Sequence, residues 1–258
     1  MFKQNTKPPL LVLLLSALVA CSGASYDGAV LETRGLDRAS DGEEHLTRVD
    51  RVARRLNAAT QGESPYLIPV LDTAIMSDFW DCRERGRQHR GIDFAGVGPQ
   101  LGLGAPIVAI GRSRVTEIGR PQDDPVRFGR PLQRRETTVR DGVELPTSAV
   151  IEGYGRVFFF TENYGQWHSG AIVITELLDG PLAGHQVRYM HLGAVVPDLQ
   201  IGTILEAGDE LGLMGGTAIL HSGPHVHVDA EDPLEVRIDL APFLGLEARP
   251  ADERFSCQ

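Results

Sequence analysis

The sequence predicts a mainly β domain with antiparallel strands, preceded by one short helix. Two observations support this fold class. After Pro65 the chain consists of short apolar runs rich in β-prone residues, and Gly and Pro separate these runs. The clearest helical periodicity covers residues 41–59, where apolar residues recur at spacings of three and four. Many short strands with few helical patterns are typical of an antiparallel β domain.

The N-terminal residues predict export and a lipid anchor. Lys3 and Lys7 precede an apolar run from Leu10 to Ala20, which is shorter than a membrane-spanning helix and has the shape of a signal peptide. The run ends in Leu-Val-Ala-Cys, which resembles the bacterial lipobox and implies cleavage before Cys21 and lipidation of its thiol. Ser22 follows in place of an Asp, which implies an outer-membrane lipoprotein facing the periplasm. A plain signal peptide with a chance cysteine is the alternative.

Composition divides the chain into four parts. Residues 1–20 are the predicted lipoprotein signal peptide, and residues 21–65 are a polar tether that contains the amphipathic helix. Residues 66–250 form the β domain, and residues 251–258 form a tail. The helix is expected to pack on the domain or to act as a spacer.

The β domain contains eight predicted strands, each a short apolar or β-branched run bounded by turn residues. They are Tyr66–Leu71, Gly91–Ala95, Ile107–Ile110, Arg114–Ile118, Arg156–Thr161, Ala171–Leu177, Gln186–His191 and His225–Val228.

Charge is distributed unevenly along the chain. The formal net charge of −10 argues against a general nucleic-acid binder. Residues 121–166 nevertheless carry six arginines together with several Pro and Gly, and we call this segment the Arg-rich insertion. Two interpretations stay open: a cationic rim that steers an anionic polymer, or a solvated loop or small hairpin excursion.

Two cysteines remain once Cys21 is assigned to the lipid anchor. Cys82 and Cys257 are an even pair, and an exported protein meets an oxidising compartment. A disulfide between them and two unpaired thiols are both compatible with the sequence, because spacing alone does not place their Cα atoms within bridging distance.

Histidines in three short motifs are the candidates for chemistry. In an extended strand, His225 and His227 project to the same side, about 7 Å apart. His89 and Asp93 lie four residues apart, about 13 Å along a straight strand, and Gly91 can relieve that distance by a bend. A third motif, Tyr189-Met190-His191-Leu192, is expected to place Tyr189 and His191 on one face by alternation.

Together these motifs resemble those of lysostaphin-type (LytM-type) zinc peptidases, which cleave peptide bonds in peptidoglycan. The matching patterns are His89-x-x-x-Asp93, Tyr189-x-His191-Leu192 and Gly223-Pro224-His225-x-His227, in the order of the family. The resemblance covers roughly residues 85–245, apart from the Arg-rich insertion. It implies an antiparallel sandwich or half-barrel, similar to a duplicated hybrid motif, with a zinc site in its cleft.

The resemblance also implies a role for each motif residue. His89, Asp93 and His227 would bind one Zn²⁺, and His191 and His225 would be the catalytic pair. Three N and O ligands leave a fourth position for water, as hydrolytic zinc sites do. One departure from the family is Val228-Asp229 where Phe-Glu is usual. Of the other histidines, His45, His168 and His185 are expected to be surface or structural residues, and His221 is a weak candidate for the cleft wall.

The leading hypothesis is a zinc-dependent endopeptidase of peptidoglycan stem peptides or cross-links, attached to the membrane through Cys21. Its expected partners are peptidoglycan, the membrane and an unidentified divisome or amidase partner. The alternative is a non-catalytic wall-binding or amidase-activating module that keeps the metal for stability. A zinc peptidase that acts on secreted proteins is a more distant hypothesis.

Overall fold

The computed structural model describes residues 64–70, 73–83, 86–247, 249–250 and 254. The predicted signal peptide, the anchor at Cys21, the helix at residues 41–59 and Cys257 lie outside the described residues. Within the described part of the chain, no helix is both long enough and apolar enough to cross a membrane.

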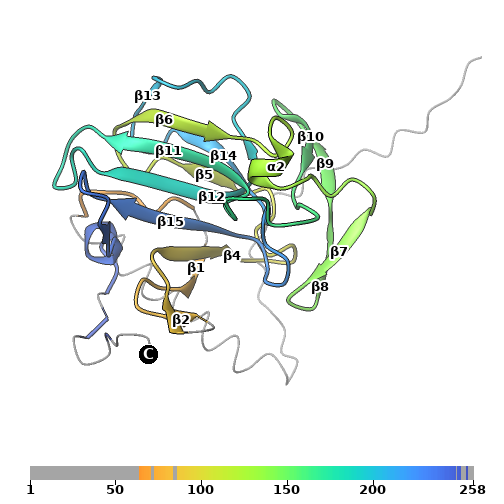
Figure 1. Cartoon of the computed structure of the whole chain (residues 1–258), viewed down its shortest axis with the longest axis horizontal. Helices are drawn as coiled ribbons and strands as arrows, with labels where there is room; N and C mark the ends of the chain where they lie inside the picture. The colour runs from red at the N-terminus through yellow and green to blue at the C-terminus, as the bar shows by residue number, and fades with distance from the viewer. Residues whose placement is uncertain (1–63, 71–72, 84–85, 248, 251–253, 255–258) are drawn as a thin grey trace, which may run out of the picture. The chain divides into compact units, whose positions relative to one another are not determined.

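Ten strands form one large sheet, which confirms the predicted mainly β fold (Figure 1). They are β1 (Thr73–Ser77), β4 (Ile92–Gly96), β5 (Pro106–Val108), β6 (Ser113–Gly119), β11 (Ala171–Leu177), β12 (Gln186–Val195), β13 (Ile204–Leu205), β14 (Glu210–Met214), β15 (His225–Glu231) and β16 (Arg237–Ile238). The main order is β1-β4-β15-β12-β11-β6-β13, while β14 joins β12 to β5 and β16 pairs with β15. Every pairing is antiparallel.

Three separate hairpins and two short helices complete the described chain. The hairpins are β2 (Cys82–Arg83) with β3 (Arg87–Gln88), β7 (Thr137–Arg140) with β8 (Val143–Pro146), and β9 (Ser148–Ile151) with β10 (Gly155–Phe158). The helices are α2 (Pro125–Phe128) and the 3-10 helix η2 (Ala241–Leu244). Cys82 is disulfide-bonded, so the alternative of an unpaired thiol is wrong at this position.

The Arg-rich insertion is folded around a small apolar core of its own. It contains α2 and the hairpins β7–β8 and β9–β10, which lie beside one end of the large sheet (Figure 1). Leu145, Val157 and Phe160 are almost fully buried there and pack with Leu213 of β14. The guanidinium of Arg140 lies 5.1 Å from the ring centroid of Phe160. The insertion is therefore a packed subdomain made of hairpins, and it is not merely a solvated loop.

Most predicted strands are present, and one prediction is wrong. The predicted ranges overlap β4, β5, β6, β10, β11, β12 and β15. Residues 66–70 form no strand, although Tyr66 is buried in the main core. Its hydroxyl donates to the Asp179 carbonyl and accepts from the Leu182 amide, both at 2.9 Å. The apolar run there reflects the burial of a loop between two prolines, and the first strand begins later, at Thr73.

Strand β12 changes partners along one edge. Residues 186–190 pair with β15, whereas residues 192–195 pair with β14. His191 lies between the two pairings with a φ of 67°, in the left-handed region. The register between β11 and β12 shifts at the same place, because one residue of β11 lies opposite two of β12. The sheet therefore divides at His191.

Tyr189 holds the core beside this division. Its side chain is fully buried, and its hydroxyl accepts a hydrogen bond from the backbone amide of Ile110 at 3.1 Å. Burial raises the pKa of Tyr189, so the hydroxyl stays protonated.

We predict that Tyr189→Phe lowers the free energy of unfolding by about 1–3 kcal/mol, because the buried Ile110 amide loses its acceptor. Urea denaturation monitored by tryptophan fluorescence measures this change. Tyr154→Phe is the matched control, since its hydroxyl bonds Glu210 at the surface and its loss should cost no more than about 0.5 kcal/mol. Equal losses for the two variants would contradict the prediction.

Candidate metal centre

Asp93 and His227 face each other because of the register between β4 and β15. Their Cα atoms are direct partners in this antiparallel pair. The Nδ1 atom of His227 lies 2.8 Å from Oδ1 of Asp93. Val226 and Val228, on either side of His227, are fully buried in the main core. Alternation along β15 thus puts the valines in the core and the two imidazoles on the opposite face, as the sequence predicts.

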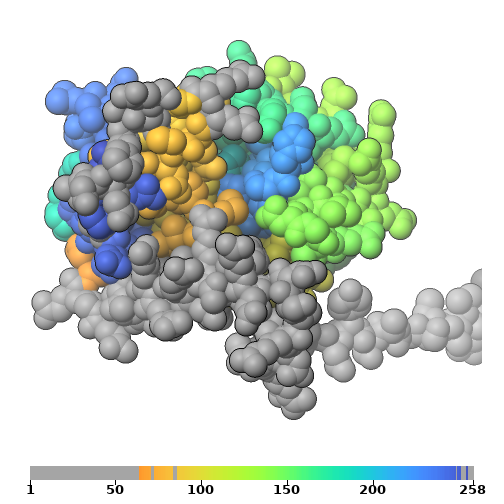
Figure 2. All heavy atoms as spheres, turned by 90° about the horizontal axis from the view of Figure 1, so that it is seen from below, coloured from red at the N-terminus to blue at the C-terminus, as the bar shows by residue number. Residues whose placement is uncertain are grey.

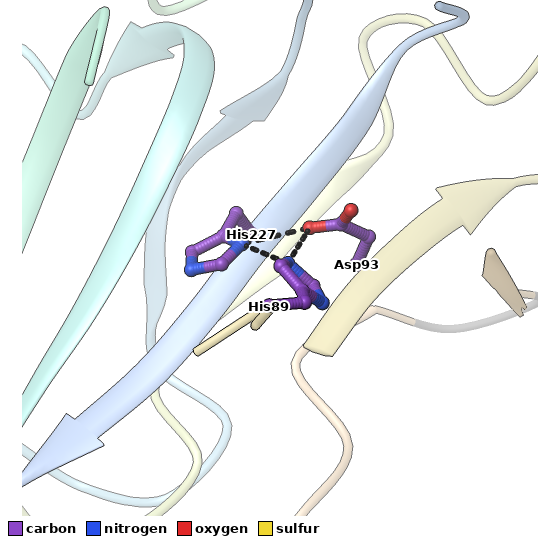
Figure 3. A group of neighbouring side chains, drawn as sticks. All are labelled: His89, Asp93 and His227. Atoms are coloured by element: carbon purple, nitrogen blue, oxygen red, sulfur yellow. Dashed lines mark hydrogen bonds and ion pairs between the residues drawn. The ribbon is translucent and has the colours of Figure 1, made fainter. Parts of the chain in front are cut away.

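His89 reaches the same point from the segment before β4. Its Nε2 atom lies 2.9 Å from Nδ1 of His227 and 3.2 Å from Oδ1 of Asp93. Figure 3 shows the three side chains pointing toward one another from three different segments. The chain bends at Gly91, where a Cβ would lie 2.5 Å from Nε2 of His227 and 2.7 Å from the Val228 carbonyl oxygen. Glycine is therefore required for this close approach.

The cluster fits a zinc ion by the chemistry of its donors. His89, Asp93 and His227 each offer one ligand atom, and these atoms all lie within 4.8 Å of one another. Two imidazole nitrogens and one carboxylate oxygen form a common set of zinc ligands. Bonds of about 2.0–2.1 Å in a tetrahedral site separate neighbouring ligand atoms by about 3.3 Å. The observed separations of 2.8, 2.9 and 3.2 Å need to open by only a few tenths of an ångström.

Each side chain of the cluster is oriented by its other polar atom. Nδ1 of His89 lies 2.8 Å from the Asp78 carbonyl oxygen, Nε2 of His227 lies 3.2 Å from Oδ2 of Asp229, and Oδ2 of Asp93 pairs with Arg83. Partners of this kind fix the tautomer of a ligating histidine and increase its basicity.

Asp229 is a residue of this centre that the motifs did not identify. It is buried and also pairs with Arg188 and Arg237, at 2.7 and 2.5 Å. Its position two residues after His227 on the same strand places both side chains on one face, and this spacing is the signal that could have identified it.

Without metal, the cluster holds a buried ion pair. Burial raises the pKa of Asp93, but hydrogen bonds from His227 and His89 outweigh burial and hold this pKa well below its ordinary value. Burial lowers the pKa of His227, but hydrogen bonds to Asp229 and Asp93 outweigh it and raise this pKa to about 9. At neutral pH His227 is therefore protonated in the metal-free protein, and a metal ion must displace that proton.

His191 and His225 lie beside the three clustered side chains. The ring centroids of His191 and His225 are 5.2 Å apart, and those of His191 and His227 are 6.2 Å apart. Nε2 of His225 lies 3.8 Å from Oδ1 of Asp93. The structure thus brings together all five residues that the motifs singled out.

The predicted face of His191 is wrong in one respect. Tyr189 pairs with Val228 and points into the core, whereas His191 lies on the face of the sheet that carries His225 and His227. The register shift in β12 and the left-handed backbone at His191 break the alternation that the sequence predicts.

Backbone carbonyls orient both of these imidazoles. Nδ1 of His191 lies 2.9 Å from the Thr217 oxygen, and Nδ1 of His225 lies 3.0 Å from the Gly223 oxygen. A carbonyl only accepts, so Nδ1 carries the proton and Nε2 is left with its lone pair. Burial lowers the pKa of both rings, and nearby His225 helps to bring that of His191 to about 3. Both rings are neutral at pH 7.

The remaining histidines do not join the cluster. His168 stacks on Tyr164 at a centroid distance of 5.1 Å, and His185 and His221 take no part in the close contacts of the centre. His45 lies outside the described residues.

We predict that Asp229→Asn weakens zinc binding by about 10–100-fold, because His227 loses the carboxylate that orients it and increases its basicity. Competition with a fluorescent zinc chelator measures the affinity.

Glu231→Gln is the matched control, because Glu231 pairs with the same two arginines, Arg188 and Arg237, without contacting His227. If both variants lost the same affinity, the effect would come from the arginine pairs and the prediction would fail.

Comparison with known proteins gives matches among solved structures alone. No protein-family model matches the sequence, and no curated protein matches it. The chain is similar to Csd3 from Helicobacter pylori, with 20% identity over 71% of this chain and 35% of that chain and a TM-score of 0.39. It is also similar to a zinc containing peptidase from Vibrio cholerae, with 17% identity over 72% of this chain and 40% of that chain and a TM-score of 0.41.

A third similar structure is the catalytic domain of the antimicrobial peptidase lysostaphin from Staphylococcus simulans. Identity is 19%, coverage is 74% of this chain and 96% of that domain, and the TM-score is 0.38. The chain spans well under half the length of the first two proteins. Lysostaphin is the protein for which the family resembled by the sequence motifs is named.

Proposed function

We propose that the protein is a zinc-dependent endopeptidase that hydrolyses peptide bonds in peptidoglycan. One observation carries the proposal: three zinc-type ligand atoms converge within 4.8 Å, beside two neutral imidazoles whose Nδ1 atoms are bonded to carbonyls. A purely structural zinc site is closed by four protein ligands, whereas a hydrolytic site keeps one position open. Within the described residues, this cluster offers three protein ligands, which leaves one position open.

His89, Asp93 and His227 would hold the ion. When bound, zinc polarises a carbonyl as a Lewis acid and lowers the pKa of water toward about 7. The protein contributes the orientation of the three ligands, through Asp78, Asp229 and Arg83, so the site is arranged before substrate binds.

His191 and His225 would move protons. Each neutral ring presents Nε2 as a base, which can accept a proton from an attacking water and return it to the leaving amine. Once protonated, either ring becomes a donor toward the negative oxygen of a tetrahedral intermediate. Because burial lowers the pKa of both rings, both are unprotonated at neutral pH and start with Nε2 able to accept a proton.

Peptidoglycan is proposed as the substrate because the five site residues stand in motifs that resemble those of lysostaphin-type peptidases. A disulfide at Cys82 is typical of an oxidising compartment and therefore supports export. An exported protein could reach peptidoglycan, which lies outside the cytoplasm. Attachment to the outer membrane through lipidated Cys21, facing the periplasm, is part of the same proposal.

Zinc-loaded protein is expected to release soluble fragments from purified sacculi, and chelation should stop the release. His227→Ala should lose both metal and activity. His225→Ala should keep the metal and lose activity by about 100-fold or more, because it removes a proton-transfer group. Chromatography and mass spectrometry of the fragments measure activity and identify the bond that is cut.

Intact sacculi in the presence of fully bound zinc would contradict the proposal and favour the non-catalytic module. Digestion of casein without digestion of sacculi would instead assign the centre to a peptidase of secreted proteins.

A further inference from the structure

The Arg-rich insertion contacts the segment that leads into β15. The hairpin β7–β8 ends in a two-residue turn, Asp141-Gly142, closed by the pair Arg140 and Val143. Both turn residues have positive φ, 45° and 78°, as expected for an Asp-Gly hairpin turn. In Figure 2 the light green spheres of the insertion border the light blue spheres of the chain near residue 220. The insertion therefore borders the segment that precedes β15 (Figure 2).

Asp141 makes a direct hydrogen bond to that segment. Its Oδ2 atom accepts from the backbone amide of Gly223 at 2.7 Å. A Cβ at position 223 would lie 2.7 Å from the same carboxylate oxygen, so the absence of a side chain permits the approach. A carboxylate acceptor gives a charge-assisted hydrogen bond, which is stronger than a bond between neutral groups.

Gly223 connects Asp141 to His225. The amide of Gly223 donates to Asp141, and its carbonyl oxygen accepts from Nδ1 of His225 at 3.0 Å. Among the described residues, the backbone of residues 220–224 makes no other hydrogen bond besides these two. The amide and the carbonyl of Gly223 belong to neighbouring peptide groups that meet at its Cα, so the bond from Asp141 restrains the residue whose carbonyl holds His225.

The other imidazole has a parallel support from the end of the insertion. The amide of Ala218 donates to Oγ1 of Thr161 at 2.7 Å. Ala218 follows Thr217, whose carbonyl oxygen is bonded to Nδ1 of His191. The amide of Gly216 donates to the carbonyl of Phe159 at 2.8 Å. His191 and His225 are thus each held by a backbone carbonyl whose own segment is hydrogen-bonded to residues between 141 and 161.

We propose that Asp141 is a positioning residue for catalysis: it restrains the backbone of Gly223, whose carbonyl oxygen holds His225 with Nδ1 protonated and Nε2 free toward the metal centre. This inference rests on the proposed hydrolytic function. It gives the Arg-rich insertion a part in the reaction, because the insertion carries the residue that orients a proton-transfer group. Misplacement of such a group by about 1 Å is enough to reduce a rate by about 100-fold.

Two substitutions at position 141 separate the hydrogen bond from the fold of the turn. Asp141→Gly keeps a residue suited to positive φ and removes the acceptor. Asp141→Asn also suits the turn and keeps an amide oxygen that can accept from Gly223. Full-length, zinc-loaded protein is used for both variants and for the wild type.

Three readouts are compared: zinc content, kcat and KM for a soluble cross-linked muropeptide, and the His225 tautomer from long-range ¹H–¹⁵N NMR of its ring. In Asp141→Gly we expect unchanged zinc content, a kcat lower by about 10-fold or more and a KM within about twofold. The His225 ring should change from a single Nδ1-protonated tautomer to a mixture. Asp141→Asn should restore the tautomer and most of kcat.

A wild-type His225 tautomer in Asp141→Gly would overturn the inference whatever the activity, because Asp141 would then not act through this ring. Wild-type kcat in the same variant would also overturn it. An inactive wild-type protein would reject the proposed function instead, and in that case the NMR comparison would still decide whether Asp141 positions His225.

Discussion

The pairing of β4 with β15 is the constraint on which the centre depends. It sets Asp93 opposite His227, and the bend at Gly91 then lets His89 reach both. Because side chains alternate along a strand, a slip of one residue would send His227 into the core and a valine into the cluster. Val226 and Val228 prevent that slip, since both are fully buried. Apolar burial on one face of the strand thus fixes polar geometry on the other.

A second constraint is the division of the sheet at β12. His191 stands where the partner of this strand changes from β15 to β14, and its left-handed backbone turns the ring toward His225. Bulges often redirect a side chain near an active site, and they leave one residue without its regular backbone hydrogen bonds in the sheet. The lost pairing is offset by hydrogen bonds around Thr217, which is buried and contacts both His191 and Leu192 through its backbone and hydroxyl oxygens.

Sequence reasoning found the residues of the centre but only part of their support. The resemblance to the motifs of one family predicted His89, Asp93 and His227 together, although His227 lies 134 residues from Asp93 in the sequence. Asp229 and Asp141 were missed for different reasons. Asp229 was visible as an acid two residues after His227, whereas Asp141 is 82 residues from Gly223 in the sequence, and no local pattern predicts such a contact. The face of His191 was predicted wrongly because alternation assumes a regular strand.

We propose that His89, Asp93 and His227 bind one zinc ion through Nε2, Oδ1 and Nδ1. Anomalous diffraction from crystals of the zinc-loaded protein, recorded on both sides of the zinc absorption edge, tests it most directly. Zinc held by this cluster should give a single strong peak about 2.0–2.2 Å from each of these three atoms. A peak elsewhere on the protein, or no peak at this cluster under saturating zinc, would contradict it.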